Sequence, residues 1–378
     1  MCGVNISSLE KNKNVRLLIG VCDIGNGHIN RQRCIINILL KCNVDIVLAV
    51  TKRSVSSFNS LYPQLKKVIV SIPWVYCNNQ GVDFVNTLNR YKDANEDLYK
   101  SFLEFAVKVQ ECFEGELPDL VMSDYEPNVA QFAYACDIPL IGMEQQSKML
   151  YIDSEPLAGL TINEEIARLK YFFPKVTDRV ISSFFPVDRL EKENVIVLPP
   201  ILKTIKKVAP IKNKVIVYFS SYADDYEQFT KVLELAKKEG KYTFYVYTKL
   251  EFDNYKGVDN IIFKRISDEF NENISDCNLI ISSSGHQLIS EAISLEKPLF
   301  IFSFHTFEQN YNALMVEKFQ LGVKGKEFST DEFENFVDSI ETYRQNMISY
   351  KQQYWPNSWD ETFIDVLDNK YGIHFTEK

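Results

Sequence analysis

NLIISSSGHQLISEAISLEKPLFIFSF, residues 278–304, contains two short apolar runs separated by a turn of small residues and an amphipathic stretch. Each apolar run has the length of a buried strand, and the stretch between them has the spacing of a helix. A strand, a helix and a strand in this order form a parallel βαβ unit. The stretch therefore predicts a doubly wound α/β sheet.

The same alternation continues on both sides of this unit. It restarts after residues 194–213, whose three prolines and four lysines indicate a connection between domains. The expected strands are 15–22, 44–50, 67–72, 119–124, 138–143, 214–221, 242–248, 260–264, 278–285 and 298–304, and the expected helices include 29–41, 93–114, 127–136, 225–238 and 360–370. We predict an α/β protein with two Rossmann-like doubly wound domains that face each other across a cleft at the carboxyl ends of the strands.

The composition bounds the function. The chain has 378 residues, of which 46% are hydrophobic, enough to fill two cores. A formal net charge of −9 with interspersed signs disfavours a nucleic-acid partner. The eight cysteines form no CxxC pair, so neither a zinc site nor a disulfide framework is indicated. Without a secretion signal or an apolar span, we expect a cytoplasmic protein, with peripheral membrane contact left open.

The loop after the first expected strand carries Gly25, Asn26 and Gly27. Glycines there allow a tight turn and close approach to a ligand, as in the dinucleotide fingerprint. The third glycine of that fingerprint is replaced by Asn30, and the second strand ends in residues 51–53 without an acidic residue to hold a ribose. A nicotinamide oxidoreductase is therefore the least favoured enzyme class.

His28 directly follows this loop, and Asp124 ends another expected strand. If the two strands are neighbours, the aspartate can fix the histidine tautomer, and the histidine can take a proton from a hydroxyl near neutral pH. The structural alternative is that His28 closes a turn and Asp124 caps a helix. Gln145 and Gln146 follow a later strand and are expected on the same rim.

A second group of polar residues follows the strands of the carboxyl-terminal half. Ser284 and Gly285 precede a helix whose first amides and dipole suit a diphosphate. Glu291 has a carboxylate for the vicinal hydroxyls of a ribose, and Glu308 and Gln309 suit the hydroxyls of a sugar ring. Each has a structural alternative, since Glu291 can be a solvated helix residue and Gln309 a surface cap.

This second group resembles the donor-binding signature of the two-domain GT-B glycosyltransferases. It is similar above all to the bacterial enzyme that transfers N-acetylglucosamine onto lipid I, to the galactolipid synthases and to their uncharacterised bacterial and archaeal relatives. The family pattern is Ser-Gly-x-x-Thr-x-x-Glu-Ala, then Gly-x-Pro, then Gln-x-x-Asn-Ala. The matching residues here are Ser284, Gly285, Glu291, Ala292, Pro298, Gln309, Asn312 and Ala313. The likeness covers about residues 15–325.

The resemblance implies a role for each part of the chain. Residues 1–200 would bind the acceptor, 201–345 the nucleotide sugar, and 346–378 would form a helix that returns to the first domain. The amides after Gly285 would bind the diphosphate, Glu291 the ribose and Gln309 the sugar. Ile266 and Ser267 align with the loop that reads the base. His28 and Asp124 match a base dyad of plant-type relatives.

Three departures from the family pattern concern the donor. Leu288 replaces the phosphate-binding threonine, which shifts part of that task to His286. Ser220, Ser221 and Tyr222 replace a glycine-rich turn, and residues 295–297, Leu-Glu-Lys, stand where the family has a glycine before proline.

We therefore predict an inverting, metal-independent hexosyltransferase that uses a UDP-sugar as co-substrate and needs no further cofactor. No DxD tripeptide follows a strand, and the helix amides would stabilise the leaving diphosphate. The acceptor would contact Gly25, Asn26, Gly27, Gln145 and Gln146. The alternatives are a nucleotide-sugar epimerase of the same fold and a binding protein that has lost turnover.

Overall fold

The computed structural model describes residues 14–23, 26–78, 80–152, 162–187, 194–219, 226–248, 252–265, 269–303, 306–325 and 327–376. The chain divides into two compact units. The first continues to Ile201 and takes up the chain again at Asn357, and the second extends from Leu202 to Pro356. Each unit is described by itself.

The first unit is built on a parallel sheet with the strand order β3-β2-β1-β6-β7-β8-β9. Its strands are β1 (Val15–Val21), β2 (Val44–Thr51), β3 (Lys66–Val70), β6 (Leu120–Asp124), β7 (Leu140–Met143), β8 (Asp178–Ser182) and β9 (Val195–Leu198), with a separate hairpin of β4 (Tyr76–Asn78) and β5 (Gly81–Asp83). Its helices are α1 (Asn26–Leu39), α2 (Val55–Leu61), α3 (Phe84–Ala94), α4 (Leu98–Cys112), α5 (Pro127–Cys136), α6 (Asn163–Phe172) and α13 (Trp359–Tyr371).

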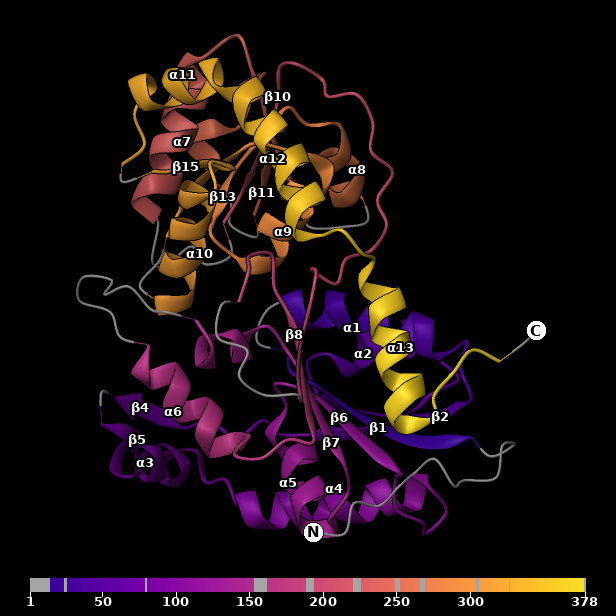
Figure 1. The fold of residues 1–378 in the computed structure, drawn as a ribbon. Coiled ribbons are helices and arrows are strands. Elements are labelled where there is room, and N and C mark those ends of the chain that lie inside the picture. Colours follow the sequence, from indigo (N-terminus) through magenta and orange to yellow (C-terminus); the bar gives the residue numbers. More distant parts are fainter. Residues whose placement is uncertain are drawn as a thin grey trace. The chain divides into compact units, whose positions relative to one another are not determined.

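Helices cover both faces of this sheet, as Figure 1 shows. Alternate residues of β1, Leu17, Ile19 and Val21, pack in one core with α1, α2 and α13. The helices α4 and α5 lie on the opposite face, where Phe105 meets Phe132 edge to face. Because parallel strands are buried on both faces, they are almost continuously apolar, which explains why their positions can be predicted well.

The last helix, α13, belongs to the first unit although it ends the chain. Phe363 and Leu367 are fully buried in the core of that unit. Asp178 of β8 accepts hydrogen bonds from Lys370 Nζ and from the Tyr371 hydroxyl, each at 2.5 Å. Burial, followed by the Asp178 contact, raises the pKa of Tyr371, so the hydroxyl stays a donor.

Asp178→Ala is expected to lower the free energy of unfolding by about 1–3 kcal/mol, because the buried Tyr371 hydroxyl loses its acceptor. Urea denaturation followed by circular dichroism measures this loss. Asp365→Ala, on the exposed side of the same helix, serves as the control and should change stability little. Equal stabilities of the two variants would contradict an anchoring role for Asp178.

The second unit has a parallel sheet with the order β12-β11-β10-β13-β14-β15. Its strands are β10 (Lys214–Tyr218), β11 (Thr243–Tyr247), β12 (Ile261–Lys264), β13 (Leu279–Ser283), β14 (Leu299–Phe302) and β15 (Gly322–Lys324). Its helices are α7 (Tyr226–Lys238), α8 (Glu269–Asp276), α9 (His286–Leu295), α10 (Phe307–Lys318), α11 (Thr330–Asp338) and α12 (Ile340–Tyr354). The prediction of two doubly wound parallel sheets is confirmed.

Two expectations about single elements need correction. The expected helix 93–114 is α4, which begins only at Leu98 because Asp97 caps it, and the separate helix α3 ends before it with Asn95 in the left-handed region at φ 52°. The expected connection 194–213 begins with β9, which pairs with β8 as the edge strand of the first sheet, and the boundary between the two units follows Ile201. Pro199 and Pro200 come directly after that short strand.

Each sheet has one point where the strand order reverses. In the first sheet β1 lies beside β6, and in the second β10 lies beside β13. Loops on the two sides of such a point turn in opposite directions and leave a crevice at the carboxyl ends of the strands, where ligands of open α/β sheets bind. His28 follows β1, Asp124 ends β6 and Ser284 follows β13, so these residues occupy the two crevices.

Within the described ranges, no helix combines the length and the apolar character that a membrane span needs.

Candidate functional site

His28 lies in the first turn of α1, which begins at Asn26. The glycine-rich loop is therefore shorter than expected, since Asn26 and Gly27 already belong to the helix and Gly25 lies outside the described residues. His28 Nδ1 is 2.7 Å from Asp124 Oδ1, and both side chains are buried. The structure thus brings together the two residues that the sequence analysis paired.

Two side chains that the sequence analysis missed also hold Asp124. Arg31 contacts both carboxylate oxygens, with Nη2 at 2.5 Å from Oδ1 and Nε at 3.1 Å from Oδ2. Gln32 Nε2 donates to Oδ2 at 2.9 Å. The signal was present in the sequence, because residues three and four positions after His28 lie on the same face of a helix.

Arg31 keeps the Asp124 carboxylate ionised. Burial alone would raise the pKa of Asp124, but the charge of Arg31, together with His28, outweighs it, so the pKa lies below its ordinary value. Asp124 is therefore ionised at neutral pH and accepts at both oxygens. Arg31 Nη2 also lies 3.0 Å from His28 Nδ1, because the two nitrogens share the acceptor Oδ1.

This arrangement determines the tautomer of His28. The ionised Asp124 needs a donor, so the ring proton lies on Nδ1 and the lone pair on Nε2. Gln146 occupies that lone pair, with its Nε2 at 3.2 Å from the ring nitrogen. Gln146 begins the short 3-10 helix η2 (Gln146–Leu150) after β7, and the neighbouring Gln145 Oε1 accepts from Lys148 Nζ at 2.6 Å.

The turn after Asp124 is strained and closely packed. Tyr125 has φ 55°, a left-handed conformation that a bulky residue rarely adopts. Its ring lies 6.2 Å from the His28 ring, and its hydroxyl donates to Glu165 of α6 at 2.6 Å. The N-cap of α5 is Glu126, which accepts from the amides of Asn128 and Val129, so Asp124 is not the helix cap of the structural alternative.

The second crevice lies between β13 and α9. Gly285 is the N-cap of α9 and has no side chain with which to cap the helix. A Cβ on Gly285 would meet none of the described atoms within 4 Å. Ser284 is fully buried, and its hydroxyl has no hydrogen-bond partner among the described residues. These features are those of an anion site at a helix N-terminus.

The start of α10 lies beside this site, because β14 pairs with β13. Thr306, not Gln309, caps α10. Its hydroxyl accepts from the backbone N–H of Gln309 at 3.3 Å. Asn312 Nδ2 donates to the Ser284 carbonyl at 3.0 Å and ties α10 to the β13 loop. Within the described ranges, Gln309 Oε1 and Asn312 Oδ1 are buried without hydrogen-bond partners.

Glu291 lies two turns inside α9 and is half-buried. Burial raises its pKa to about 6, although Gln287 Nε2 donates to its Oε1 at 3.0 Å. The neighbouring Leu288, which replaces the family threonine, is buried in the core. His286 is the first residue of α9 and is buried, and Glu308 stands in the first turn of α10. The predicted donor residues Ser220, Ser221, Ile266 and Ser267 lie outside the described residues.

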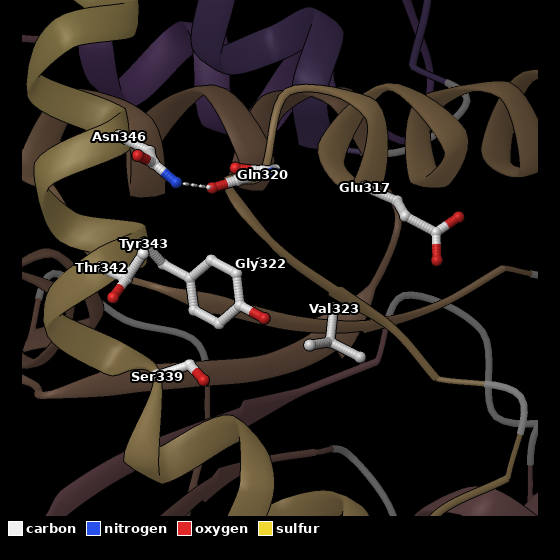
Figure 2. Close-up of a pocket in the computed structure, with 8 residues that line it drawn as sticks. All are labelled: Glu317, Gln320, Gly322, Val323, Ser339, Thr342, Tyr343 and Asn346. Atoms are coloured by element: carbon white, nitrogen blue, oxygen red, sulfur yellow. Dashed lines mark hydrogen bonds between the residues drawn. The ribbon is translucent and has the colours of Figure 1, made fainter.

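A pocket of about 330 Å³ lies elsewhere in the second unit, between the end of α10, β15 and α12 (Figure 2). Polar and apolar residues both line it, and Asn346 Nδ2 donates to the Gln320 carbonyl. None of the predicted site residues lines it. In the described part of the chain, no three His, Cys, Asp or Glu side chains gather as a metal ion would require.

Solved structures of glycosyltransferases resemble this chain. Arabidopsis thaliana UGT89C1 complexed with quercetin has 14% identity and a TM-score of 0.68, with 94% of this chain and 98% of that chain covered. Phytolacca americana UGT2 complexed with UDP-2fluoro-glucose and pterostilbene has 14% identity and a TM-score of 0.68, with 95% of this chain and 99% of that chain covered. The spinosyn forosaminyltransferase SpnP has 15% identity and a TM-score of 0.67, with 94% of this chain and 99% of that chain covered. At these identities the likeness concerns the fold.

Sequence comparison adds the family. A search of curated proteins finds no sequence relative of the chain. The model of glycosyl transferase family 1 matches residues 15–341, which include both crevices and all the predicted site residues. The chain therefore belongs to glycosyl transferase family 1, and it is a glycosyltransferase with the GT-B fold.

Proposed function

We propose that the protein transfers a hexose from a UDP-sugar to an acceptor hydroxyl, with inversion at the anomeric carbon. The observation that carries this proposal is the buried contact of His28 with Asp124, which leaves the lone pair of His28 on Nε2. A neutral imidazole oriented by a carboxylate is suited to act as a general base.

In the proposed reaction His28 Nε2 takes the proton of the acceptor hydroxyl as the hydroxyl oxygen attacks the anomeric carbon. The bond from that carbon to the diphosphate oxygen breaks, and its electron pair leaves with UDP. Attack from the face opposite the diphosphate inverts the configuration. Asp124 stabilises the imidazolium that forms, and Arg31 and Gln32 keep the carboxylate in place.

For the donor we propose binding at the start of α9. The diphosphate would meet the first amides of that helix, with Ser284 and His286 beside them, and the sugar would meet Glu308 and Gln309. The unpartnered Ser284 hydroxyl and Gln309 Oε1 support this placement. A UDP donor is supported by the UGT2 structure, which holds UDP-2fluoro-glucose. We also propose that Ile266 and Ser267 contact the nucleotide base of the donor. Ser220 and Ser221 are proposed as further donor-binding residues.

For the acceptor we propose the first unit, with Gly25, Asn26, Gly27, Gln145 and Gln146 near the attacking hydroxyl. Within the family we propose a relationship to the lipid I N-acetylglucosaminyltransferase and galactolipid synthase group, which the motif residues of α9 and α10 support. A cytoplasmic location, with peripheral contact to a membrane, is part of the same proposal.

The affinity for the donor is expected to depend on pH through Glu291. Its raised pKa of about 6 means that the carboxylate becomes protonated as the pH falls through 6, and a neutral acid binds the ribose hydroxyls less strongly. KM for the UDP-sugar should therefore rise between pH 7 and pH 5. Glu291→Gln should remove this dependence, whereas a KM that stays flat in the unchanged protein would exclude a ribose contact.

Metal independence is a separate expectation. It rests on the lack of a DxD tripeptide after a strand and on the helix amides as the stabilising group for the leaving diphosphate. Transfer measured with excess EDTA should keep its rate. A loss of activity that Mg²⁺ or Mn²⁺ restores would contradict the proposal.

The function is tested by incubating the protein with a panel of UDP-sugars, first by thermal shift and then by product analysis. Release of UDP, slow with water and faster with an acceptor, supports a transferase. Isomerised nucleotide sugar would instead show an epimerase, and tight binding without any product would show a sensor.

A further inference from the structure

The Nε2 nitrogen of His28 already has a partner within the protein. Gln146 Nε2 lies 3.2 Å from it, and because the Nε2 of His28 carries a lone pair, the glutamine amide must be the donor. Both side chains are buried, with 6% of His28 and 9% of Gln146 exposed. Neither water nor an acceptor hydroxyl can reach the lone pair while this contact persists.

The other end of the same amide is unsatisfied. Gln146 Oε1 is buried and has no hydrogen-bond partner among the described residues. A buried acceptor without a donor is unfavourable, so the resting position of the amide is only half satisfied. If the Gln146 side chain moves away, an acceptor hydroxyl can replace its hydrogen bond to His28, and Gln146 Oε1 becomes able to accept a hydrogen bond.

We propose that Gln146 is a gate that selects the acceptor over water. In the absence of an acceptor its N–H group covers His28 Nε2, and the acceptor hydroxyl replaces it on binding. This proposal rests on the proposed function. It assigns Gln146 to the suppression of donor hydrolysis, the reaction in which water attacks the anomeric carbon, gives its proton to His28 Nε2 and releases UDP.

The test measures UDP release from UDP-glucose and from UDP-N-acetylglucosamine without any acceptor. Gln146→Ala and Gln146→Met remove the N–H group, and Met keeps most of the bulk. Both are expected to raise the rate of UDP release by about two- to tenfold, the range that one neutral hydrogen bond carries. Gln131→Ala, an exposed glutamine of α5, is the control and should hydrolyse like the unchanged protein.

A third variant is expected to change the rate of UDP release in the opposite direction. In Gln146→Glu the carboxylate would hold a proton on His28 Nε2, so UDP release should fall below that of the unchanged protein. Damage to the fold would lower all three rates together, and thermal unfolding of each variant detects such damage.

The outcomes separate this proposal from the proposed function. If the unchanged protein binds neither UDP-sugar and releases no UDP, the proposed function fails. If UDP binds equally to all variants by calorimetry but Gln146→Ala and Gln146→Met hydrolyse no faster than the unchanged protein, the transferase stands and the gate is overturned.

Discussion

His28→Ala is expected to lower kcat/KM for sugar transfer by about 10²–10⁴-fold, the contribution of a positioned general base. The reason is local, because His28 Nε2 is the basic nitrogen that the contact with Asp124 orients. The donor site that we propose lies on other elements, the starts of α9 and α10, so the affinity for UDP should remain unchanged. Initial rates and isothermal calorimetry with UDP measure the two quantities.

His374→Ala is the matched control for this variant. His374 follows α13 in the same unit, and half of its side chain is exposed. Its removal should affect neither the rate nor the binding of UDP. A His28→Ala variant that transfers sugar as fast as this control would remove His28 as the base.

The second large effect is expected at Arg31. Arg31→Met leaves the buried Asp124 carboxylate without its cation, which costs about 3–5 kcal/mol of stability in comparable buried pairs. Because Arg31 holds the pKa of Asp124 below its ordinary value, removing it lets the carboxyl group take up a proton more readily. The loss of stability should therefore be smaller at low pH and grow as the pH rises. Urea denaturation at several pH values measures this dependence.

Two other titratable groups lie near Asp124 and His28. Glu144 acts on Asp124 through space, and burial raises its pKa despite the nearby Arg179. Tyr125, in contact with the His28 ring, has a pKa raised by burial and by Glu165, and it stays neutral. Neither supplies a cation to replace Arg31.

Arg33→Met, two residues further along α1, is the control for Arg31→Met. Its side chain is half-buried, and its backbone carbonyl accepts from the Tyr62 hydroxyl, a contact that the substitution keeps. A loss of stability in Arg31→Met that is the same at every pH would mean that the arginine contributes only packing. A loss that shrinks as the pH rises would contradict the charge argument.

The sequence predicted the fold well because parallel strands are buried on both faces. The helix 127–136 was predicted with its observed bounds, since Pro127 starts it and the apolar run of β7 follows. Helix breaks were predicted less well. The division between α3 and α4 depends on the left-handed Asn95 and on the Asp97 cap, which are local features inside a long amphipathic pattern.

The candidate site was predicted only in part. His28 and Asp124 were found because each follows a strand, and neighbouring strands bring them together. Arg31 and Gln32 were missed, because a basic residue in an amphipathic helix usually faces solvent, and only the approach of Asp124 turns them into partners. The contact of Gln146 with His28 could not be foreseen either, since it depends on the path of the chain after β7.

We propose that His28 is the base and that the donor binds at the start of α9. The most direct test is a crystal structure of the protein with UDP-2-fluoro-glucose, a donor that resists transfer. We expect the diphosphate at the start of α9. We expect the anomeric carbon to face His28 Nε2, with room for one hydroxyl group between the carbon and the nitrogen. A nucleotide bound at any other place, or an anomeric carbon that faces away from His28, would contradict this proposal.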